Sequence, residues 1–355
     1  MSTNYDELKS KLDKYGQEHL LRFWNELNDE EKKELTESIN EIDFEQLDEL
    51  IKSIDKDEDT RKNIEQAEYI PFPKEEEDFY LLKEAGVTDI KGSPSFYEKM
   101  REKGENLLSN GKVAAFVVAG GQGSRLGYDA PKGFFPIGPV TEKSLFQIYF
   151  EKLKALNKKH STEIPFLIMT SEMTHNDTID FMKKHNYFGY NKDKVHIFQQ
   201  GKMPAVDRNG KILMAEKHKP FFSPNGHGGS VFALKDSGML DKLIKEGIEH
   251  IFYFQVDNVL VRMCEPYFLG CHIDKENELS IKVIEKAYPE EKLGVYVINN
   301  GKPFIIEYSD LSDEKRYAKD ESEKYAGKLK YRLGSHAIHI LSLAFIKSFT
   351  SRYKN

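Results

Sequence analysis

Two cationic side chains stand within a glycine-rich stretch that could bind phosphate groups. The stretch reads VVAGGQGSRLGYDAPKG over residues 117–133, and it places Arg125 and Lys132 seven positions apart. Pro131 restricts the backbone directly before Lys132, so the ammonium group is presented from a stiffened loop. Glycines let the backbone approach a ligand, and consecutive N–H groups can hold phosphate oxygens. The glycines that we expect to act in this way are Gly120, Gly121 and Gly123.

Two common phosphate-binding motifs fit this stretch poorly. A Walker A loop requires a glycine followed by Lys and then Ser or Thr, and the stretch lacks that combination. A Rossmann dinucleotide fingerprint fits Gly121 and Gly123, but its third glycine position is occupied by Leu126. A dinucleotide-binding dehydrogenase therefore stays an alternative that leaves a second glycine cluster, at residues 226–229, unexplained.

A carboxylate follows a later apolar stretch, FYFQVDNVLV at residues 252–261. Asp257 is expected at the carboxyl end of a buried strand. Mg²⁺ binds through one or two carboxylates together with substrate phosphates, so this side chain is a candidate metal ligand. An aspartate that only begins a turn is the alternative that the residues alone leave open.

Short apolar stretches alternate with helical patterns from Val113 onward. The stretches cover residues 114–119, 164–169 and 251–254, and helical patterns cover residues 174–185 and 241–246. This alternation predicts βαβ units, hence an α/β, Rossmann-like fold with a mainly parallel central sheet. Ligands of such sheets bind beyond the carboxyl ends of the strands. We therefore expect Gly120 and the phosphate site at that edge.

The N-terminal part of the chain is rich in Glu, Lys and Leu, and its apolar residues recur at helical spacing. We predict amphipathic helices there, with the pair Phe23 and Trp24 in their core. The predicted domains are an N-terminal helical region (1–105), an α/β domain (106–345) and a short C-terminal segment (346–355). The apolar positions that carry the helical pattern are Leu20, Leu21, Phe23, Trp24 and Leu27.

Composition excludes several classes of protein. The 355 residues carry a net charge of −7, which does not favour binding to nucleic acid or to an acidic membrane surface. No apolar run approaches the roughly 18 residues of a membrane span, and the first residues lack the apolar segment of a secretory signal. Cys264 and Cys271 fit no zinc spacing and are expected to be ordinary thiols. We expect a cytoplasmic protein.

The stretch at residues 117–133 resembles the signature loop of sugar-phosphate nucleotidyltransferases. The chain up to about residue 345 resembles the eukaryotic-type UDP-N-acetylglucosamine pyrophosphorylases of the UDP-sugar pyrophosphorylase family. Further segments match in order: FQQGKMPA (198–205), SPNGHGGSVFAL (223–234), EKLGVYV (291–297), IIEYSD (305–310) and YRLGSHAIHI (331–340).

The resemblance implies a uridylyltransferase. Residues 106–345 would form its nucleotide- and sugar-binding catalytic domain, and residues 346–355 would be the start of a truncated C-terminal segment. UTP and N-acetylglucosamine 1-phosphate would give UDP-N-acetylglucosamine and pyrophosphate, with Mg²⁺ as cofactor. Arg125 would contact the β- and γ-phosphates, Lys132 the α-phosphate, and Asp257 the metal ion. The implied nucleotide-binding residues are Gly120, Gly121, Gly123, Gln200 (which would read the uracil), Gly226 and His227.

The same resemblance implies a sugar site made of Gly294, Glu307, Tyr308 and Ser335. His227 and Ser335 stand where the family often has Asn, so the sugar stays open. A glucose-1-phosphate or broad-specificity UDP-sugar pyrophosphorylase is one alternative, and a catalytically silent UDP-sugar-binding protein is another. The family continues into a small C-terminal domain that we expect to be absent from this chain; the oligomeric state is not readable from the sequence.

Overall fold

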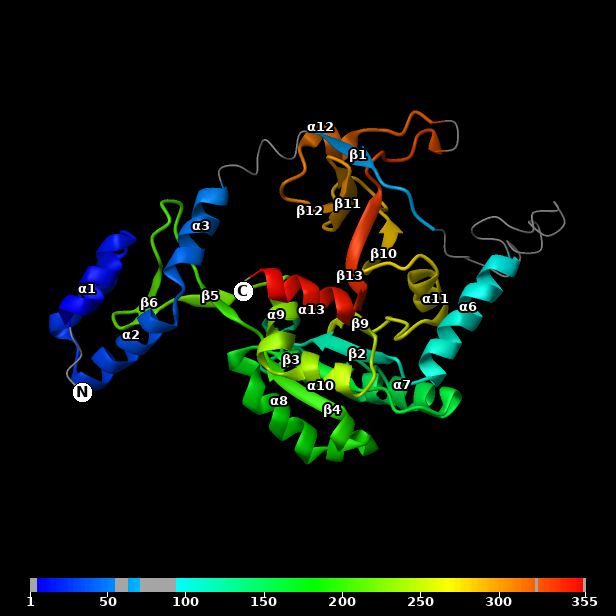
Figure 1. Cartoon of the computed structure of the whole chain (residues 1–355), viewed down its shortest axis with the longest axis horizontal. Coiled ribbons are helices and arrows are strands. Elements are labelled where there is room, and N and C mark those ends of the chain that lie inside the picture. Colours follow the sequence, from blue (N-terminus) through cyan, green and yellow to red (C-terminus); the bar gives the residue numbers. More distant parts are fainter. Residues whose placement is uncertain (1–4, 55–62, 71–93, 323–324, 354–355) are drawn as a thin grey trace. The chain divides into compact units, whose positions relative to one another are not determined.

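The computed structural model describes residues 5–54, 63–70, 94–322 and 325–353. Their contacts form two compact units, one of Met1–Asn63 with Gly201–His227 and the other of Ile64–Gln200 with Gly228–Asn355 (Figure 1). The domain boundaries expected near residues 105 and 345 stay predictions.

Helices and short hairpins make up the smaller unit. Its core contains Leu12, Trp24, Leu35 and Ile39, so the assignment of Trp24 to a core is confirmed. The assignment of Phe23 is wrong, because this side chain is only half-buried and lies outside the cluster. Buried Gln17 joins the helices to the later segment by donating to Gly210 O (2.8 Å) and accepting from Ile212 N (3.0 Å). The elements are α1 (Tyr5–Lys14), η1 (Glu18–Leu21), η2 (Trp24–Glu26), α2 (Asp29–Glu41), α3 (Phe44–Ile54), β5 (Lys202–Pro204), β6 (Met214–Glu216), β7 (Lys219–Pro220) and β8 (Phe222–Pro224).

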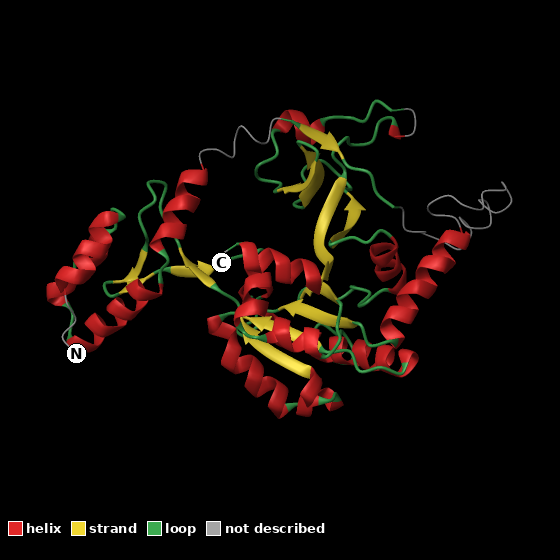
Figure 2. Cartoon of the chain, in the orientation of Figure 1, coloured by secondary structure: helices red, strands yellow, loops and turns green. Residues whose placement is uncertain are grey.

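A nine-stranded mixed sheet organises the larger unit (Figure 2). Its order is β1-β11-β13-β9-β2-β3-β4, with β10 paired to β13 and β12 paired to β11. The core strands β9, β2, β3 and β4 are parallel, which confirms the predicted α/β fold. The strands are β1 (Ile64–Gln66), β2 (Val113–Val118), β3 (Phe166–Thr170), β4 (Val195–Gln199), β9 (His250–Gln255), β10 (Leu279–Glu285), β11 (Gly294–Asn299), β12 (Lys302–Ile306) and β13 (Leu333–Ser342).

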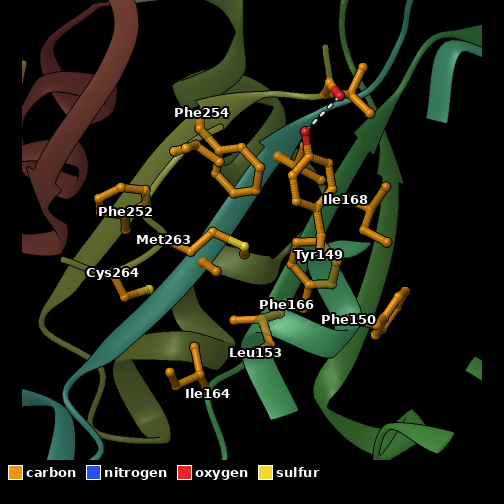
Figure 3. Packing of buried hydrophobic residues seen from close by; sticks show 14 of the residues in the cluster. Tyr149, Phe150, Leu153, Ile164, Phe166, Ile168, Phe252, Phe254, Met263 and Cys264 are labelled. Carbon is orange, nitrogen blue, oxygen red and sulfur yellow. Dashed lines mark hydrogen bonds between the residues drawn. The ribbon is translucent and has the colours of Figure 1, made fainter. Parts of the chain in front are cut away.

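Helices bury both faces of the parallel core, which explains why β2 reads VAAFVV without alternation. Ala115, Val117 and Phe254 face α7 and α8, and the residues between them in the strands face α9, α10 and α13. Figure 3 shows the first of these clusters, around Tyr149 and Phe254. The helices are α6 (Pro94–Ser109), α7 (Leu145–His160), α8 (Glu172–Lys184), α9 (Gly229–Asp236), α10 (Met239–Lys245), α11 (Pro266–Asp274), α12 (Asp313–Tyr317) and α13 (Leu343–Arg352).

The sheet continues with antiparallel strands beyond β9, and β13 is irregular there. β10 pairs Lys282 with Ile338 but Val283 with Ser335, so two extra residues bulge from β13. Ala337 has a φ of 53°, and its backbone N–H donates a hydrogen bond to Ser335 Oγ at 3.3 Å. The bulge changes the direction of the strand next to a candidate sugar residue.

Two glycines allow α6 and α11 to touch, and this contact gives a stability prediction. A Cβ on Gly270 would lie 1.7 Å from Met100 O, and one on Gly104 would lie 1.9 Å from Pro266 O. Gly270→Ala must push the two backbones apart, so we expect it to lower the free energy of unfolding by about 3 kcal/mol. Urea unfolding would measure the loss. Gly228→Ala is the control, since no described atom lies within 4 Å of its Cβ position; equal stability of the two variants would contradict the prediction.

A buried histidine pair gives a prediction for stability against pH. His272 is 1% exposed, and its Nε2 lies 3.2 Å from His250 Nδ1 while its Nδ1 lies 2.8 Å from Ser280 Oγ. Burial lowers the pKa of His272 from 6.5 to about 4, and His250 adds to the lowering. The folded protein disfavours the charged His272 ring, so the unfolded chain takes up this proton at a higher pH. The stability that comes from keeping His272 neutral is therefore complete above about pH 6.5 and is lost as the pH falls toward 4.

Urea unfolding at several pH values between 7 and 4 would test this prediction. In His272→Gln the unfolding free energy should fall less steeply between pH 7 and pH 4 than in the unchanged protein. This expectation holds even if the substitution changes the unfolding free energy at neutral pH. An unchanged slope in the variant would show that other groups cause the acid sensitivity.

Candidate active site

The loops that follow the four parallel strands meet at one edge of the sheet. Gly120 follows β2, Ser171 follows β3, Gln200 follows β4 and Asp257 follows β9. Since parallel strands end at the same edge, the phosphate loop, the candidate uracil-reading amide and the candidate metal ligand share this edge. The sequence predicts Gly120 at the carboxyl end of the first apolar strand, and its position just after β2 confirms this.

Gly120 is enclosed by its neighbours. A Cβ there would lie 3.0 Å from Gln200 Oε1 and 3.1 Å from Ser171 N. Ser171 Oγ donates to Gly120 O at 2.8 Å, and Gln200 N donates to Thr170 O at 2.8 Å. A side chain at Gly120 would therefore displace the Gln200 amide, which lies against the glycine loop.

The rest of the glycine loop folds back on itself. Gly121 O accepts from Lys132 N at 3.0 Å, and Gly123 N donates to Ala130 O at 2.8 Å. A Cβ on Gly123 would lie 2.8 Å from Tyr128 O, so this position requires glycine. The two turns η3 (Ser124–Leu126) and η4 (Lys132–Phe134) complete the loop. This folding places the stem of Lys132 against Gly121, with Cδ and Cε each 3.4 Å from the Cβ position.

Lys132 and Asp257 form an ion pair at this edge although 125 residues separate them. Lys132 Nζ lies 2.9 Å from Asp257 Oδ2, and the side chains are 22% and 46% exposed. Both groups can therefore be reached by a ligand from solvent. Arg125 lies exposed on η3 in the same loop. The geometry places a cation and a carboxylate beside the glycine loop, a combination suited to a polyphosphate bound with a cation.

The donor set at Asp257 is compatible with magnesium. The described residues contain no cluster of three or more His, Cys, Asp or Glu side chains that could enclose a metal ion. Mg²⁺ does not need such a cluster, because it retains waters and takes ligands from one or two carboxylates and the substrate phosphates. Asp257 offers one accessible carboxylate beside the glycine loop. Magnesium at this residue stays a prediction.

Three of the four candidate sugar residues come together at the antiparallel strands, with Glu307 directly after the end of β12. Gly294 begins β11 and is paired with Ser335 on β13, and Glu307 Oε1 lies 3.5 Å from the Cβ position of Gly294. Because β13 runs antiparallel to β9, its Ser335 end extends toward the edge that carries Asp257. Tyr308, the fourth, is 40% exposed.

Gly226 and His227 belong to the smaller unit, whereas the other candidate residues belong to the larger one. Gly226 has a φ of +72° and follows Asn225, whose N–H donates to Gly201 O at 3.2 Å. The positive φ explains why glycine is favoured at this position.

Ser171 is a residue of this edge that the sequence analysis missed. Its hydroxyl holds the carbonyl of Gly120, and its backbone N–H donates to Thr174 Oγ1 at 3.1 Å. A serine directly after an apolar stretch, with a second hydroxyl residue three positions later, is a capping pattern that would have identified the start of α8.

Comparison with known proteins identifies the family of this chain. The family model described as UTP–glucose-1-phosphate uridylyltransferase matches residues 46–327. The chain belongs to this family. It is 34% identical over 356 residues to UDP-N-acetylglucosamine diphosphorylase 2 of Arabidopsis thaliana, covering 96% of this chain and 68% of the relative. It is 38% identical over 279 residues to UDP-N-acetylglucosamine pyrophosphorylase of Saccharomyces cerevisiae, covering 75% of this chain and 58% of the relative.

The uridylyltransferase family also accounts for the fold. The crystal structure of the uridine diphosphate N-acetylglucosamine pyrophosphorylase from Trypanosoma brucei superposes with a TM-score of 0.81 at 24% identity, covering 99% of this chain and 69% of that one. The family model and the two relatives at 34% and 38% identity confirm the resemblance to UDP-N-acetylglucosamine pyrophosphorylases that the motifs indicated. Within the described ranges, no helix combines the length and apolar character needed to cross a lipid bilayer.

Proposed function

We propose that this protein transfers uridylyl groups from UTP to N-acetylglucosamine 1-phosphate. The observation that carries the proposal is the meeting of Lys132 and Asp257 beside the glycine loop, with Nζ and Oδ2 2.9 Å apart. Gln200 lies against the same loop, and the names of the relatives that span nearly the whole chain support the N-acetylated sugar. The partners of the reaction are UTP and the sugar 1-phosphate.

The chemistry requires positioning and charge neutralisation more than protein-supplied bonds. An oxygen of the sugar phosphate attacks the α-phosphorus of UTP, the bond to the bridging oxygen breaks, and pyrophosphate leaves. No general base is needed, because phosphate monoesters are largely ionised near neutrality.

Each group at the edge of the sheet has a role in this scheme. Lys132 stabilises the charge that develops around the α-phosphate, and Arg125 binds the β- and γ-phosphates of the leaving group. Asp257 would hold Mg²⁺, which when bound neutralises phosphate charge and helps to orient the two substrates. Gln200 offers both a donor and an acceptor, as the edge of uracil requires.

Pyrophosphate release from UTP with Mg²⁺ tests the proposal. Parallel assays would contain N-acetylglucosamine 1-phosphate, N-acetylgalactosamine 1-phosphate, glucose 1-phosphate or no sugar. Fastest release with N-acetylglucosamine 1-phosphate supports the proposal and shows that His227 and Ser335 are compatible with that sugar. Fastest release with glucose 1-phosphate would instead assign the chain to glucose uridylyl transfer. No release with any sugar, together with binding of UDP-sugars, would indicate a silent binding protein.

A further inference from the structure

We infer that helix α7 positions both Lys132 and Asp257, and that Lys152 on this helix is a positioning residue for the loop that carries Asp257. This inference rests on the proposed function, because it concerns how the phosphate-binding pair is held. The two loops come from distant parts of the sequence, and α7 contacts each of them through residues other than Lys132 and Asp257.

The first contact holds the turn after β9. Tyr149 Oη donates to Val256 O at 2.8 Å, next to Asp257 (Figure 3). Lys152 Nζ, one turn further along α7, donates to Val259 O at 2.5 Å and Val261 O at 3.0 Å. Two side chains of one helix thus bind carbonyls on both sides of Asp257.

The second contact holds the loop that carries Lys132. Gly133 lies so close to α7 that a Cβ there would be 2.0 Å from Phe146 Cε2. Leu145 N, at the start of the helix, donates to Phe135 O at 3.1 Å. The backbone next to Lys132 is therefore fixed against the first turn of α7, as the backbone next to Asp257 is fixed against the following turns.

The consequence is a fixed separation between the two charged groups. A helix is stiff, so loops bound to its successive turns keep their spacing, and Lys132 and Asp257 stay in contact at 2.9 Å. Burial lowers the pKa of Lys152. The two carbonyls that accept from its ammonium group act in the opposite direction, because they stabilise the charged form. A lysine suits this half-buried position on α7, because its ammonium group has three N–H donors and can bind two carbonyls at once.

Hydrogen exchange of the free protein tests the contact without nucleotide or metal. In Lys152→Met, the backbone amides of residues 256–261 should exchange faster than in the unchanged protein. Lys154→Met is a matched control, because Lys154 Nζ also donates to a loop carbonyl from α7, that of Phe188 at 3.2 Å. The control should leave exchange at residues 256–261 unchanged. Unchanged exchange in Lys152→Met would overturn the inference.

Calorimetric titration with UTP tests the link to the site. Lys152→Met should weaken UTP binding about tenfold when Mg²⁺ is present, as loss of a residue that orients a metal ligand does. In EDTA the affinity should change much less. Equal losses with and without Mg²⁺ would assign Lys152 a general structural role and overturn the inference. Failure of the proposed function is recognised separately, as absence of pyrophosphate release by the unchanged protein.

Discussion

Lys132→Ala is expected to lower the turnover number about 10²–10³-fold, the effect of removing one preorganised group that stabilises transition-state charge. The ammonium group lies 2.9 Å from Asp257 Oδ2 and against Gly121, so it is held in place before substrate binds. In the proposed mechanism, its interaction with the α-phosphate strengthens as the attacking oxygen approaches. For this reason kcat and kcat/KM should fall by similar factors, with a small change in KM.

Steady-state pyrophosphate release with varied UTP would measure these constants. Lys143→Ala is the matched control, since Lys143 Nζ pairs with the surface residue Glu151 at 2.7 Å and precedes the same helix. Surface ion pairs contribute little to stability, so the control should keep nearly full turnover. Turnover of Lys132→Ala within a few-fold of the unchanged protein would remove Lys132 from the proposed chemistry.

The sequence predicted the local parts of this site and missed those that depend on distant contacts. Apolar stretches located β2, β3 and β9, because strands buried on both faces need continuous apolar residues. Glycine spacing located the tightly packed loop after β2, because close backbone packing at Gly120 and Gly123 excludes side chains. Phosphate binding by this loop stays a prediction.

The antiparallel half of the sheet was not predicted. β11 and β13 pair across about forty residues of chain. The register between β10 and β13 shifts at the bulge that follows Ser335. Nothing in the local pattern fixes such a register, since the bulge interrupts the alternation that would reveal it. The same holds for the Lys132–Asp257 pair, which arises only when β2 and β9 become neighbours in the sheet.

Helix α7 depends both on a local sequence pattern and on contacts with distant parts of the chain. Its helical pattern can be recognised from neighbouring residues alone. The carbonyls to which Tyr149 and Lys152 donate, however, lie 107 to 109 residues further along the chain. Tyr149 is fully buried, and its hydroxyl satisfies the carbonyl of Val256. A buried polar group of this kind needs a partner, so its conformation is strongly specified.

Asp257→Asn is expected to lower turnover about 10²–10³-fold and to raise the Mg²⁺ concentration needed for half-maximal rate. A metal ion that stabilises charge on transferring phosphate contributes several kcal/mol, and an amide binds Mg²⁺ more weakly than a carboxylate of the same size. The substitution also removes the charged partner of Lys132, whose Nζ lies 2.9 Å away, so both groups of the pair are affected.

A Mg²⁺ titration of pyrophosphate release, with UTP held constant, would separate loss of metal binding from loss of fold. Asp274→Asn is the matched control, because Asp274 Oδ1 also pairs with a lysine, Lys103 Nζ at 2.7 Å, but lies at the end of α11. Its Mg²⁺ dependence should equal that of the unchanged protein. If Asp257→Asn keeps the same Mg²⁺ dependence, the carboxylate does not hold the metal, and its role is limited to orienting Lys132.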